Sequence, residues 1–462
     1  MPFYQKFVRN VLCPLDRWRS GDAREFHYLR EFERSQYLSL TEVRELQFRR
    51  LKALLEHASR QCPFYRRQFD AARVAPGDVC SLDDLQAFPV LEKRHIQEHR
   101  DEMIAANWPR ADLIPNLTGG STGTPISFFL SRDRAWTRKA ATWRHNRWAG
   151  WDLGDKVGSL WGAARDLPAH SLKQRLRNWL LDRTVTLNTA LITEERLRDF
   201  HARLKKFRPK VLVGYANSLR LFAQYVKCHG LAAYQPHSII STAEVLEPTD
   251  RALIEDVFGC RTFNRYGCRE VSVIASECVE HSGMHIMAEG LYVEVVCGDR
   301  PAQPGEAGAV LVTDLLNLAM PLIRYRIGDM ATPATGPCRC GRGLPRLEGL
   351  QGRATDFLVG ADGRLVSGAA LTVVMVAKRP GLGQVQIWQD TRGKVLFKIV
   401  KRDSSSPTAE DLGFLDAQTR LYLGQDVKIE HEFVDSLPSE TSGKFLFCRS
   451  SAACDFVDLQ NR

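Results

Sequence analysis

Residues 116–125 read NLTGGSTGTP, a short stretch that combines three glycines with four hydroxyl side chains. Glycine lets the backbone turn tightly, and exposed N–H groups and hydroxyls donate hydrogen bonds to phosphate oxygens. A Walker-type P-loop needs a lysine after its last glycine, whereas Thr124 follows Gly123 here. The stretch therefore predicts a phosphate-binding loop of another kind, which needs a cation from elsewhere in the chain.

The composition is that of an ordinary globular protein. The chain has 462 residues, of which 44% are apolar and 26% are charged, and at ~150 residues per domain this length suggests two or three domains. No apolar run approaches the ~20 residues that span a bilayer, and the N-terminus lacks the apolar core of a secretory signal. We expect a cytoplasmic monomer or homodimer without stable membrane insertion.

The net charge and the cysteines limit the classes of binding partner and the redox compartment that we expect. The net charge of +10 is spread along the chain, which argues against nucleic-acid binding and fits anionic small substrates such as nucleotides. Twelve cysteines in a reducing compartment are expected to be free thiols. Six isolated ones are interpreted as buried thiols: Cys13, Cys62, Cys80, Cys228, Cys260 and Cys297.

The N-terminal stretch shows a helical pattern. Apolar side chains recur at helical spacing among basic ones: Phe3, Phe7, Val8, Val11, Leu12 and Leu15, with Lys6, Arg9 and Arg17 between and after them. This predicts an amphipathic helix packed on its own domain. A helix at a membrane surface is the alternative.

Apolar runs and helical patterns alternate along most of the chain. Helices are expected at 41–75, after Pro89, at 190–208 and at 216–228. Short β-like runs are found at 156–162, 210–215, 238–242, 261–267, 291–296 and 308–315. Strands that alternate with helices predict an α/β fold with mixed sheets.

The amino-acid composition of the sequence changes over residues 347–368. Glycines cluster there, and the DG dipeptide at 362–363 predicts a tight hairpin. Strand patterns at 384–390, 394–403 and 426–434, with a helical stretch between the last two, predict a small α+β unit. We therefore expect two domains, residues 1–355 and 356–462.

Five motifs in order resemble those of the adenylate-forming enzymes, which couple a carboxylate to AMP. LTGGSTGTP (117–125) is similar to their phosphate loop, RYGCRE (265–270) to an aromatic–Gly–x–x–Glu motif, RYRIGD (324–329) to a Tyr–Arg–x–Gly–Asp motif, GRATD (352–356) to the hinge, and PSETSGK (438–444) to the catalytic-lysine motif. Within the superfamily, CPFYRRQF (62–69), FPVLEK (88–93) and RWAGWDLGDKVGSLWG (147–162) resemble the phenylacetate–CoA ligase and CapK-type branch. The resemblance implies a large N-terminal α/β domain and a small mobile α+β C-terminal domain that turns about Asp356.

The same resemblance implies the site residues. Catalytic roles fall on Lys444, Glu270 and Thr118. Tyr266 would stack on adenine, Glu270 would hold Mg²⁺, Asp329 would accept from the ribose hydroxyls, and Lys444 would reach the attacking carboxylate and the α-phosphate. The full nucleotide-binding set is Thr118, Gly119, Gly120, Ser121, Thr122, Gly123, Thr124, Ala243, Glu244, Arg265, Tyr266, Gly267, Asp329, Arg353 and Lys444.

Four of these residues also have an interpretation without a functional role. These interpretations are a core aromatic at Tyr266, a solvated helix start at Glu270, a turn cap at Asp329 and an exposed lysine at Lys444. The motif context favours the functional ones. Arg269 departs from the family, because a hydroxyl residue is usual there, and its guanidinium would contact phosphate or an anionic substrate. Trp161, Arg165, Tyr215 and Arg269 are the weaker candidates for the acid pocket.

Two short segments carry soft metal ligands. ECVEHSGMH (277–285) and CRCGR (338–342) hold Cys278, His281, His285, Cys338 and Cys340. Four such ligands from two segments suit a tetrahedral structural Zn²⁺ site, and members of the branch carry one. We expect Cys278, His285, Cys338 and Cys340 as ligands, with His281 as the rival fourth ligand and a pair of buried thiols as the non-metal alternative.

The resemblance implies an ATP-dependent, AMP-forming acid ligase. A carboxylic acid, by family default an aromatic or aryl-alkyl acid, is activated to an acyl-AMP with release of pyrophosphate, and coenzyme A is the expected acceptor. An amine or other nitrogen nucleophile is the alternative acceptor. A non-catalytic nucleotide-binding protein is less favoured, because Glu270, Asp329 and Lys444 are all present.

Overall fold

The computed structural model describes residues 2–118, 126–161, 171–189, 192–353, 357–361, 365–367, 382–401, 407–437 and 448–452. The chain forms two compact units. The first comprises residues 1–294, 311–327 and 333–349, and the second comprises 295–310, 328–332 and 350–462. The domain limits 1–355 and 356–462 expected from the sequence stay a prediction, since residues 354–356 are outside the described ranges.

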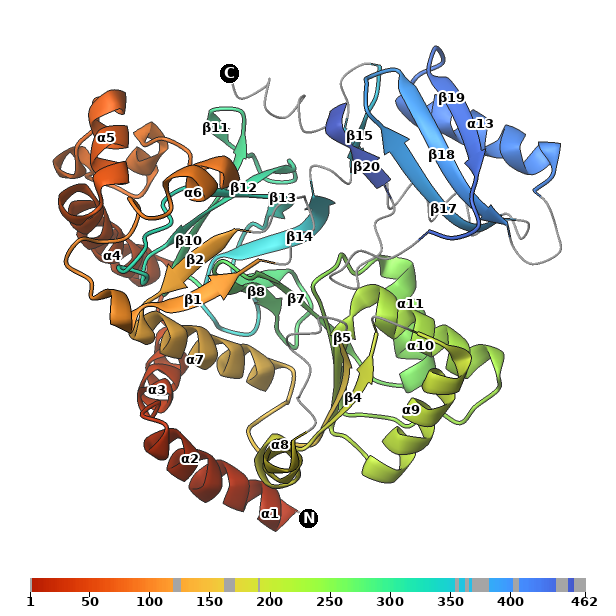
Figure 1. The fold of residues 1–462 in the computed structure, drawn as a ribbon, viewed down its shortest axis with the longest axis horizontal. Coiled ribbons are helices and arrows are strands. Elements are labelled where there is room, and N and C mark those ends of the chain that lie inside the picture. The colour runs from red at the N-terminus through yellow and green to blue at the C-terminus, as the bar shows by residue number, and fades with distance from the viewer. Residues whose placement is uncertain are drawn as a thin grey trace. The chain divides into compact units, whose positions relative to one another are not determined.

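Parallel strands form one end of the large sheet in the first unit (Figure 1). In spatial order they are β4 (Thr184–Asn188), β3 (Val157–Trp161), β5 (Val211–Tyr215), β6 (Ser238–Thr242) and β7 (Thr262–Cys268). Helices α9 (Glu194–Phe207), α10 (Ala216–Cys228) and α11 (Pro248–Phe258) pack on one face through an apolar cluster that includes Phe200, Phe222 and Phe258. The α/β class with a mixed sheet is confirmed, and all six strands expected between residues 156 and 315 agree within one residue at each end.

Further strands extend the same sheet. They are β8 (Ser272–Glu277), β9 (Met284–Ile286), β10 (Leu291–Cys297), β11 (Arg300–Pro301), β12 (Gly308–Asp314), β13 (Tyr325–Pro333) and β14 (Arg346–Arg353). The pairs β7–β8, β8–β9, β9–β14 and β10–β11 are antiparallel. The order of the 12-stranded sheet is β11-β10-β12-β13-β14-β9-β8-β7-β6-β5-β3-β4. A separate antiparallel pair, β1 (Ile114–Leu117) and β2 (Ser127–Leu130), flanks the Gly-rich stretch.

Helices precede the sheet. The N-terminal ones are α1 (Pro2–Phe7), the π-helical η1 (Val8–Leu12), α2 (Cys13–Arg19), α3 (Arg24–Ser35), α4 (Leu40–Gln61), α5 (Pro63–Ala72) and α6 (Lys93–His99), with short 3₁₀ turns at Pro76–Asp78, Asp83–Ala87 and Arg110–Asp112. The expectation of one helix over 41–75 is corrected to two. Pro63 begins α5 because proline suits a first helical position, and the preceding Cys62 is extended, with φ −113° and ψ 108°.

Helix α7 (Arg132–Trp148) is one of the elements that the sequence did not predict. It buries two arginines, and each meets a buried carboxylate: Arg134 Nε donates to Asp314 at 2.7 Å, and Arg144 Nη1 donates to Glu289 at 2.5 Å. The hydrophobic periodicity of the sequence does not reveal this helix, because its inner face buries charged side chains together with apolar ones and so carries no continuous apolar stripe.

The second unit holds a four-stranded sheet of order β19-β18-β17-β20. Its elements are β17 (Leu382–Gln389), β18 (Lys394–Lys401), α13 (Ala409–Leu423), β19 (Lys428–Phe433) and β20 (Cys448–Ser450), and its core includes Ile387, Phe397 and Leu415. Strands β15 (Phe357–Val359) and β16 (Leu365–Ser367) pair antiparallel on either side of the DG dipeptide. Over the described residues, the helices fall short of the length and apolarity that crossing a membrane requires.

We predict that Arg134→Met destabilises the first unit strongly, because it leaves the Asp314 carboxylate buried without its cation. Removing one partner of a buried ion pair costs about 3–5 kcal/mol. The free energy of unfolding in urea measures the loss. Arg44→Met is the matched control, since the Arg44–Asp83 pair is exposed and is worth less than about 1 kcal/mol. Equal losses in the two variants contradict the prediction.

Candidate functional site

The carboxyl ends of the parallel strands bring several predicted residues into one row. Tyr215 of β5 pairs with Thr242 of β6, which pairs with Arg265 of β7. Trp161 ends β3, and its ring centroid lies 4.8 Å from that of Tyr215. Ligands of open α/β sheets bind beyond the carboxyl ends of the strands, so this edge is the candidate site.

Thr118 closes the base of the Gly-rich loop. Its backbone N–H donates to the Ile126 carbonyl at 3.0 Å, and its hydroxyl accepts from the Ile126 N–H at 3.0 Å. The side chain is buried, so the geometry gives Thr118 the role of fixing where the loop leaves and re-enters the β1–β2 pair. Gly119, Gly120, Ser121, Thr122, Gly123 and Thr124 lie outside the described residues.

Residues 243 and 244 follow β6 directly. Ala243 adopts a left-handed conformation with φ +69°, which is costly for a residue with a Cβ and is found where function or packing imposes it. Glu244 Oε2 accepts from the Asn217 N–H at 2.8 Å, at the first turn of α10. The carboxylate therefore joins the ends of β5 and β6, and the N-terminal dipole of α10 stabilises its charge.

Strand β7 carries the start of the RYGCRE motif. Tyr266 is buried. Arg265 is half-buried, and desolvation of its guanidinium lowers its pKa to about 10. Among the described residues, Nη2 of Arg265 has no hydrogen-bond partner. Gly267 sits at a register shift between β7 and β8, where a Cβ would lie 2.5 Å from the Ser272 carbonyl oxygen. Glycine is required there because the two strands approach too closely for a side chain.

Glu270 is held by contacts that the sequence analysis did not single out. Tyr325 donates its hydroxyl to Glu270 Oε1 at 3.1 Å, which links the second and third motifs. Arg138 Nη2 donates to the Arg269 carbonyl at 2.6 Å, and Arg134 Nη2 donates to the Val271 carbonyl at 3.0 Å. Arg134 and Arg138 are one helical turn apart on α7, and this spacing was the available signal for their joint role.

The FPVLEK segment also supports this region. Leu91 forms a parallel bridge with Tyr325, its N–H donating to the Arg324 carbonyl at 3.1 Å and its carbonyl accepting from the Arg326 N–H at 3.0 Å. Glu92 lies 3.0 Å from Arg326. This branch-specific segment therefore fixes the strand that presents Tyr325 to Glu270.

The remaining predicted residues are placed only in part. Asp329 lies half-buried on β13, after Gly328 with φ +93°. Arg353 ends β14, and nothing is described of its side chain. Arg165, Asp356 and Lys444 lie outside the described residues. Their roles stay predictions.

Four predicted metal ligands converge in the first unit. One ligand atom each from Cys278, His285, Cys338 and Cys340 all lie within 4.8 Å of one another. The Sγ atoms of Cys278 and Cys338 are 3.7 Å apart, and Cys340 Sγ is 3.3 Å from His285 Nε2. With metal–sulfur bonds of ~2.3 Å, a tetrahedral ion separates its sulfur ligands by ~3.8 Å, so the geometry fits such an ion.

The environment of the cluster suits a cation as well. Burial raises the pKa of the Cys278 thiol to about 12 and lowers the pKa of His285 to about 4. A neutral imidazole is the form that binds a metal, and a divalent ion offsets the cost of a buried thiolate.

The rival ligand His281 takes part in a different interaction. Its Nδ1 lies 3.2 Å from Glu277 Oε2 and 3.4 Å from Arg251 Nη1, and its ring packs on Phe263 at 4.6 Å. Its left-handed backbone, with φ +49°, begins the turn that returns the chain to His285. The geometry therefore groups His285, and not His281, with the three cysteines.

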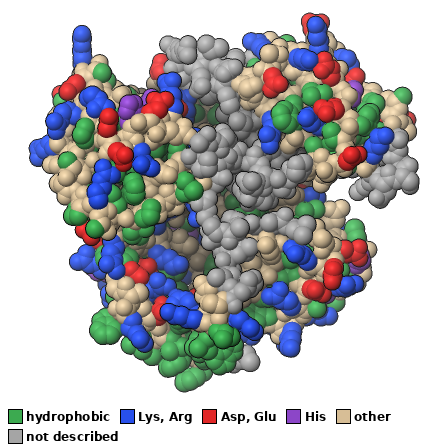
Figure 2. Space-filling model, viewed as in Figure 1, with side chains coloured by type: hydrophobic (Ala, Val, Ile, Leu, Met, Phe, Trp, Pro, Cys, Tyr) green, Lys and Arg blue, Asp and Glu red, His purple; other side chains and the backbone are tan. Residues whose placement is uncertain are grey.

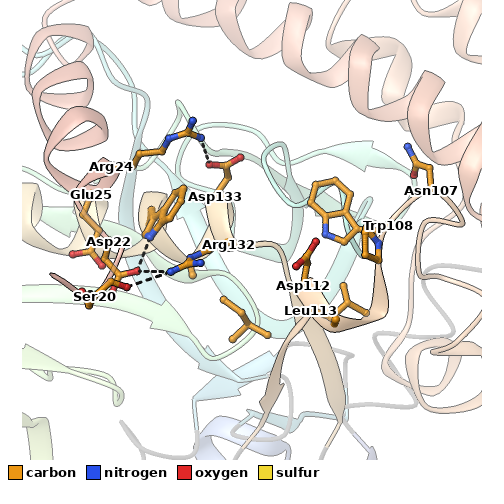
Figure 3. A pocket seen from close by; sticks show the side chains of 15 residues that line it. Ser20, Asp22, Arg24, Glu25, Asn107, Trp108, Asp112, Leu113, Arg132 and Asp133 are labelled. Atoms are coloured by element: carbon orange, nitrogen blue, oxygen red, sulfur yellow. Dashed lines mark hydrogen bonds and ion pairs between the residues drawn. The ribbon is translucent and has the colours of Figure 1, made fainter. Parts of the chain in front are cut away.

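A separate cavity of about 910 Å³ lies beside α3 and α7 (Figure 3). Its two arginines are engaged by acidic side chains: Asp22 accepts from Trp136 Nε1 at 2.9 Å and lies 3.9 Å from Arg132, and Arg24 pairs with Asp133 at 3.3 Å. Of the predicted nucleotide and acid-pocket residues that the structure describes, none lines this cavity. We therefore place the candidate site at the strand ends and not here.

Comparisons with known proteins agree with the motifs. A sequence model of the CapK C-terminal domain matches residues 358–451. The chain is 29% identical over 337 residues to a phenylacetate–coenzyme A ligase of Escherichia coli, which covers 70% of this chain and 73% of the relative. It is 22% identical over 429 residues to the CapK protein of Staphylococcus aureus, which covers 91% of this chain and 92% of the relative.

A solved structure shares the fold. The crystal structure of 2-hydroxyisobutyryl-CoA ligase in its postadenylation state superposes with a TM-score of 0.70 at 20% identity, over 92% of this chain and 93% of that one. Together these matches confirm the resemblance to the phenylacetate–CoA ligase and CapK-type branch of the adenylate-forming enzymes.

We predict that Gly267→Ala distorts the β7–β8 turn, since the new Cβ would meet the Ser272 carbonyl at 2.5 Å. Backbone shifts of this kind cost about 1–3 kcal/mol. Amide hydrogen exchange over residues 265–273 should speed up. Gly349→Ala is the control, because a Cβ there meets nothing within 4 Å. Unchanged amide exchange in Gly267→Ala would contradict the prediction, because it would show that the close approach of β7 and β8 leaves room for a Cβ at this position.

Proposed function

Since this chain is a relative of the phenylacetate–CoA ligases and of CapK, we propose that it activates a carboxylic acid with ATP and transfers the acyl group to coenzyme A. One observation carries the proposal. The carboxyl ends of β3, β5, β6 and β7 align Trp161, Tyr215 and Arg265, and the RYGCRE motif follows, in a chain that matches named acyl-CoA ligases over about seven-tenths of its length. A cytoplasmic location is part of this proposal.

The first step joins acid and nucleotide. A carboxylate oxygen attacks the α-phosphorus of ATP, a mixed anhydride forms, and pyrophosphate leaves. The protein must hold two anions in line and offset their charge. We assign the β- and γ-phosphates to the loop 118–124, adenine to Tyr266, with Ala243, Glu244 and Gly267 around it, and the ribose to Asp329, with Arg353 beside it.

Lys444 supplies the mobile cation in this proposal. Its ammonium would contact the attacking carboxylate and the α-phosphate, where negative charge develops. The assignment rests on the PSETSGK motif. Arg265, whose Nη2 lacks a partner among the described residues, offers a second cationic donor at the strand ends.

Glu270 fits a magnesium ligand. Its half-buried carboxylate accepts from Tyr325, and the α7 arginines hold the backbone carbonyls on either side of it. Mg²⁺ in phosphoryl-transfer sites is held by one or two carboxylates and the phosphate oxygens. Bound there, Mg²⁺ would neutralise phosphate charge. The contacts of Tyr325 and Arg138 fix where Glu270 can present its carboxylate.

In the second step the thiol of coenzyme A attacks the acyl carbon, the thioester forms, and AMP leaves. An amine is the alternative acceptor. The sequence match that covers the C-terminal residues is to CapK, and that name specifies no acceptor. The acid is bounded by the aromatic pair Trp161 and Tyr215, which suits an aromatic or aryl-alkyl group, with Arg165 and Arg269 as further candidates.

Pyrophosphate exchange tests the proposal. In a panel of aryl, aryl-alkyl and short aliphatic acids, we expect acid-dependent exchange between pyrophosphate and ATP, lowered by two orders of magnitude or more in Lys444→Ala while ATP binding persists. Stopped reactions with coenzyme A or with amines then identify the acceptor. Exchange that is absent with every acid, or that is unchanged in the lysine variant, contradicts the assignment.

We propose that Cys278, His285, Cys338 and Cys340 hold a structural Zn²⁺. Elemental analysis of protein purified without chelator should give about one zinc per chain, and Cys338→Ser should reduce this content and lower the thermal midpoint. Cys297→Ser is the control, because this thiol lies outside the cluster. Zinc-free protein with wild-type stability would indicate buried thiols instead.

A further inference from the structure

The outer side of the N-terminal helices is apolar. Over α1, η1 and α2, large hydrophobic side chains recur every three or four residues: Phe3, Phe7, Val11, Leu15 and Trp18. Their exposed fractions range from 38% to 82%, whereas Val8 between them is fully buried. The π-helical turn of η1 takes more residues than an α-turn, so it keeps positions four apart on one side of the helix.

A second segment continues this surface. Helix α8 (Leu172–Arg177) and the π-helical η6 (Asn178–Asp182) expose Leu172, Leu176 and Trp179 by 57% to 81%. The two segments are tied together, because Tyr4 donates its hydroxyl to the Leu180 carbonyl at 3.0 Å and Arg177 donates to both oxygens of Asp16 at 2.9 and 3.1 Å. We call these eight exposed side chains the N-terminal apolar patch. Figure 2 shows hydrophobic side chains gathered at the lower edge of the view, over α1, α2 and α8.

The patch belongs to a folded part of the chain. Gly154 adopts φ +82°, and a Cβ on it would lie 2.8 Å from the Gln5 carbonyl oxygen and 3.0 Å from Val8. Arg9 pairs with Asp152 at 3.0 Å. Helices α1 and η1 are therefore packed closely on the body, as the sequence predicted, and their outer side is presented on a fixed support.

The surroundings of the patch are basic. Residues 2–19 and 171–183 contain eight Lys and Arg but two Asp. Arg177 engages both of these carboxylates. Lys6, Arg19, Lys173 and Arg175 are exposed, and none of them has an ion-pair partner among the residues that the structure describes. A positive rim therefore surrounds the apolar side chains.

This combination favours one occupant. Tryptophan and phenylalanine beside Lys and Arg are typical of helices that lie in the interface of an anionic bilayer, where the rings reach the headgroup level. A second copy of the chain would bring two positive rims together, and like charges disfavour that contact. A protein partner would need an acidic face placed to match this rim, whereas an anionic bilayer presents negative charge over the whole contact area.

We propose that the N-terminal apolar patch docks the protein on the surface of an anionic lipid bilayer, with α1, α2 and α8 lying in the interface and no segment crossing it. The apolar side chains enter the headgroup region, and the four unpaired basic side chains contact lipid phosphates. This proposal does not depend on the proposed reaction.

Co-sedimentation of the full chain with vesicles tests it. We expect binding to vesicles of equimolar phosphatidylcholine and phosphatidylglycerol that weakens as salt rises. Trp18→Ser/Trp179→Ser removes two large apolar contacts, and Lys173→Glu/Arg175→Glu reverses two charges. Each should lower the affinity about tenfold or more.

Leu40→Ser/Leu421→Ser is the matched control, since both side chains are exposed and lie outside the patch. It should bind like the parent chain, and circular dichroism should show that all variants fold. The proposal is overturned if the parent chain stays in the supernatant, if the patch variants bind like the control, or if binding to phosphatidylcholine alone is equal. Light scattering that shows a dimer which the patch variants dissociate would overturn it in favour of a self-association surface.

Discussion

The two buried arginine–carboxylate pairs of α7 are the constraint on which the first unit depends. Arg134 with Asp314 and Arg144 with Glu289 take full charges out of water, a cost that good geometry and further hydrogen bonds must offset. In the second pair, Arg144 Nε and Glu289 Oε2 have no hydrogen-bond partner among the described residues. Arg134 uses its remaining donors on the Val271 carbonyl and the Thr137 hydroxyl. The same geometry that makes the pairs tolerable therefore fixes the turn that presents Glu270.

The cysteine–histidine cluster and the motif region share one pair of strands. Arg265 of β7 pairs with Ser276 of β8, which in turn pairs with His285 of β9. Cys278 follows β8 directly, so the cluster lies at the end of the strand that borders Tyr266. Side chains from 278–285 and 338–340 gather at the far end of this strand pair, while α7 holds the near end. The region that carries the candidate chemistry is thus braced from both sides.

Four of the five parallel strands were predictable because each is a short apolar run next to a helical pattern, and β5 and β6 match the expected ranges closely, whereas β4 was not predicted. Helix α7 was not, since its inner face carries Arg134 and Arg144 where a periodic pattern would show leucine. Motif context allowed Tyr266 and Glu270 to be proposed as site residues from sequence. The contacts of Arg138 and Tyr325 could not be predicted, although Tyr325 lies in the RYRIGD motif, because they join segments more than a hundred and about fifty residues apart, which no local pattern records.

Because the strand ends lie side by side, insertions within a strand and insertions in a loop have different consequences for the residues at those ends. Side chains alternate between the faces of a strand, so one residue inserted within β5 would turn Tyr215 to the opposite face and part it from Trp161. A loop that begins after the strand can lengthen or shorten without moving either ring. Insertions and deletions can therefore accumulate in the loops beyond these strands, while the aligned strand ends stay unaltered.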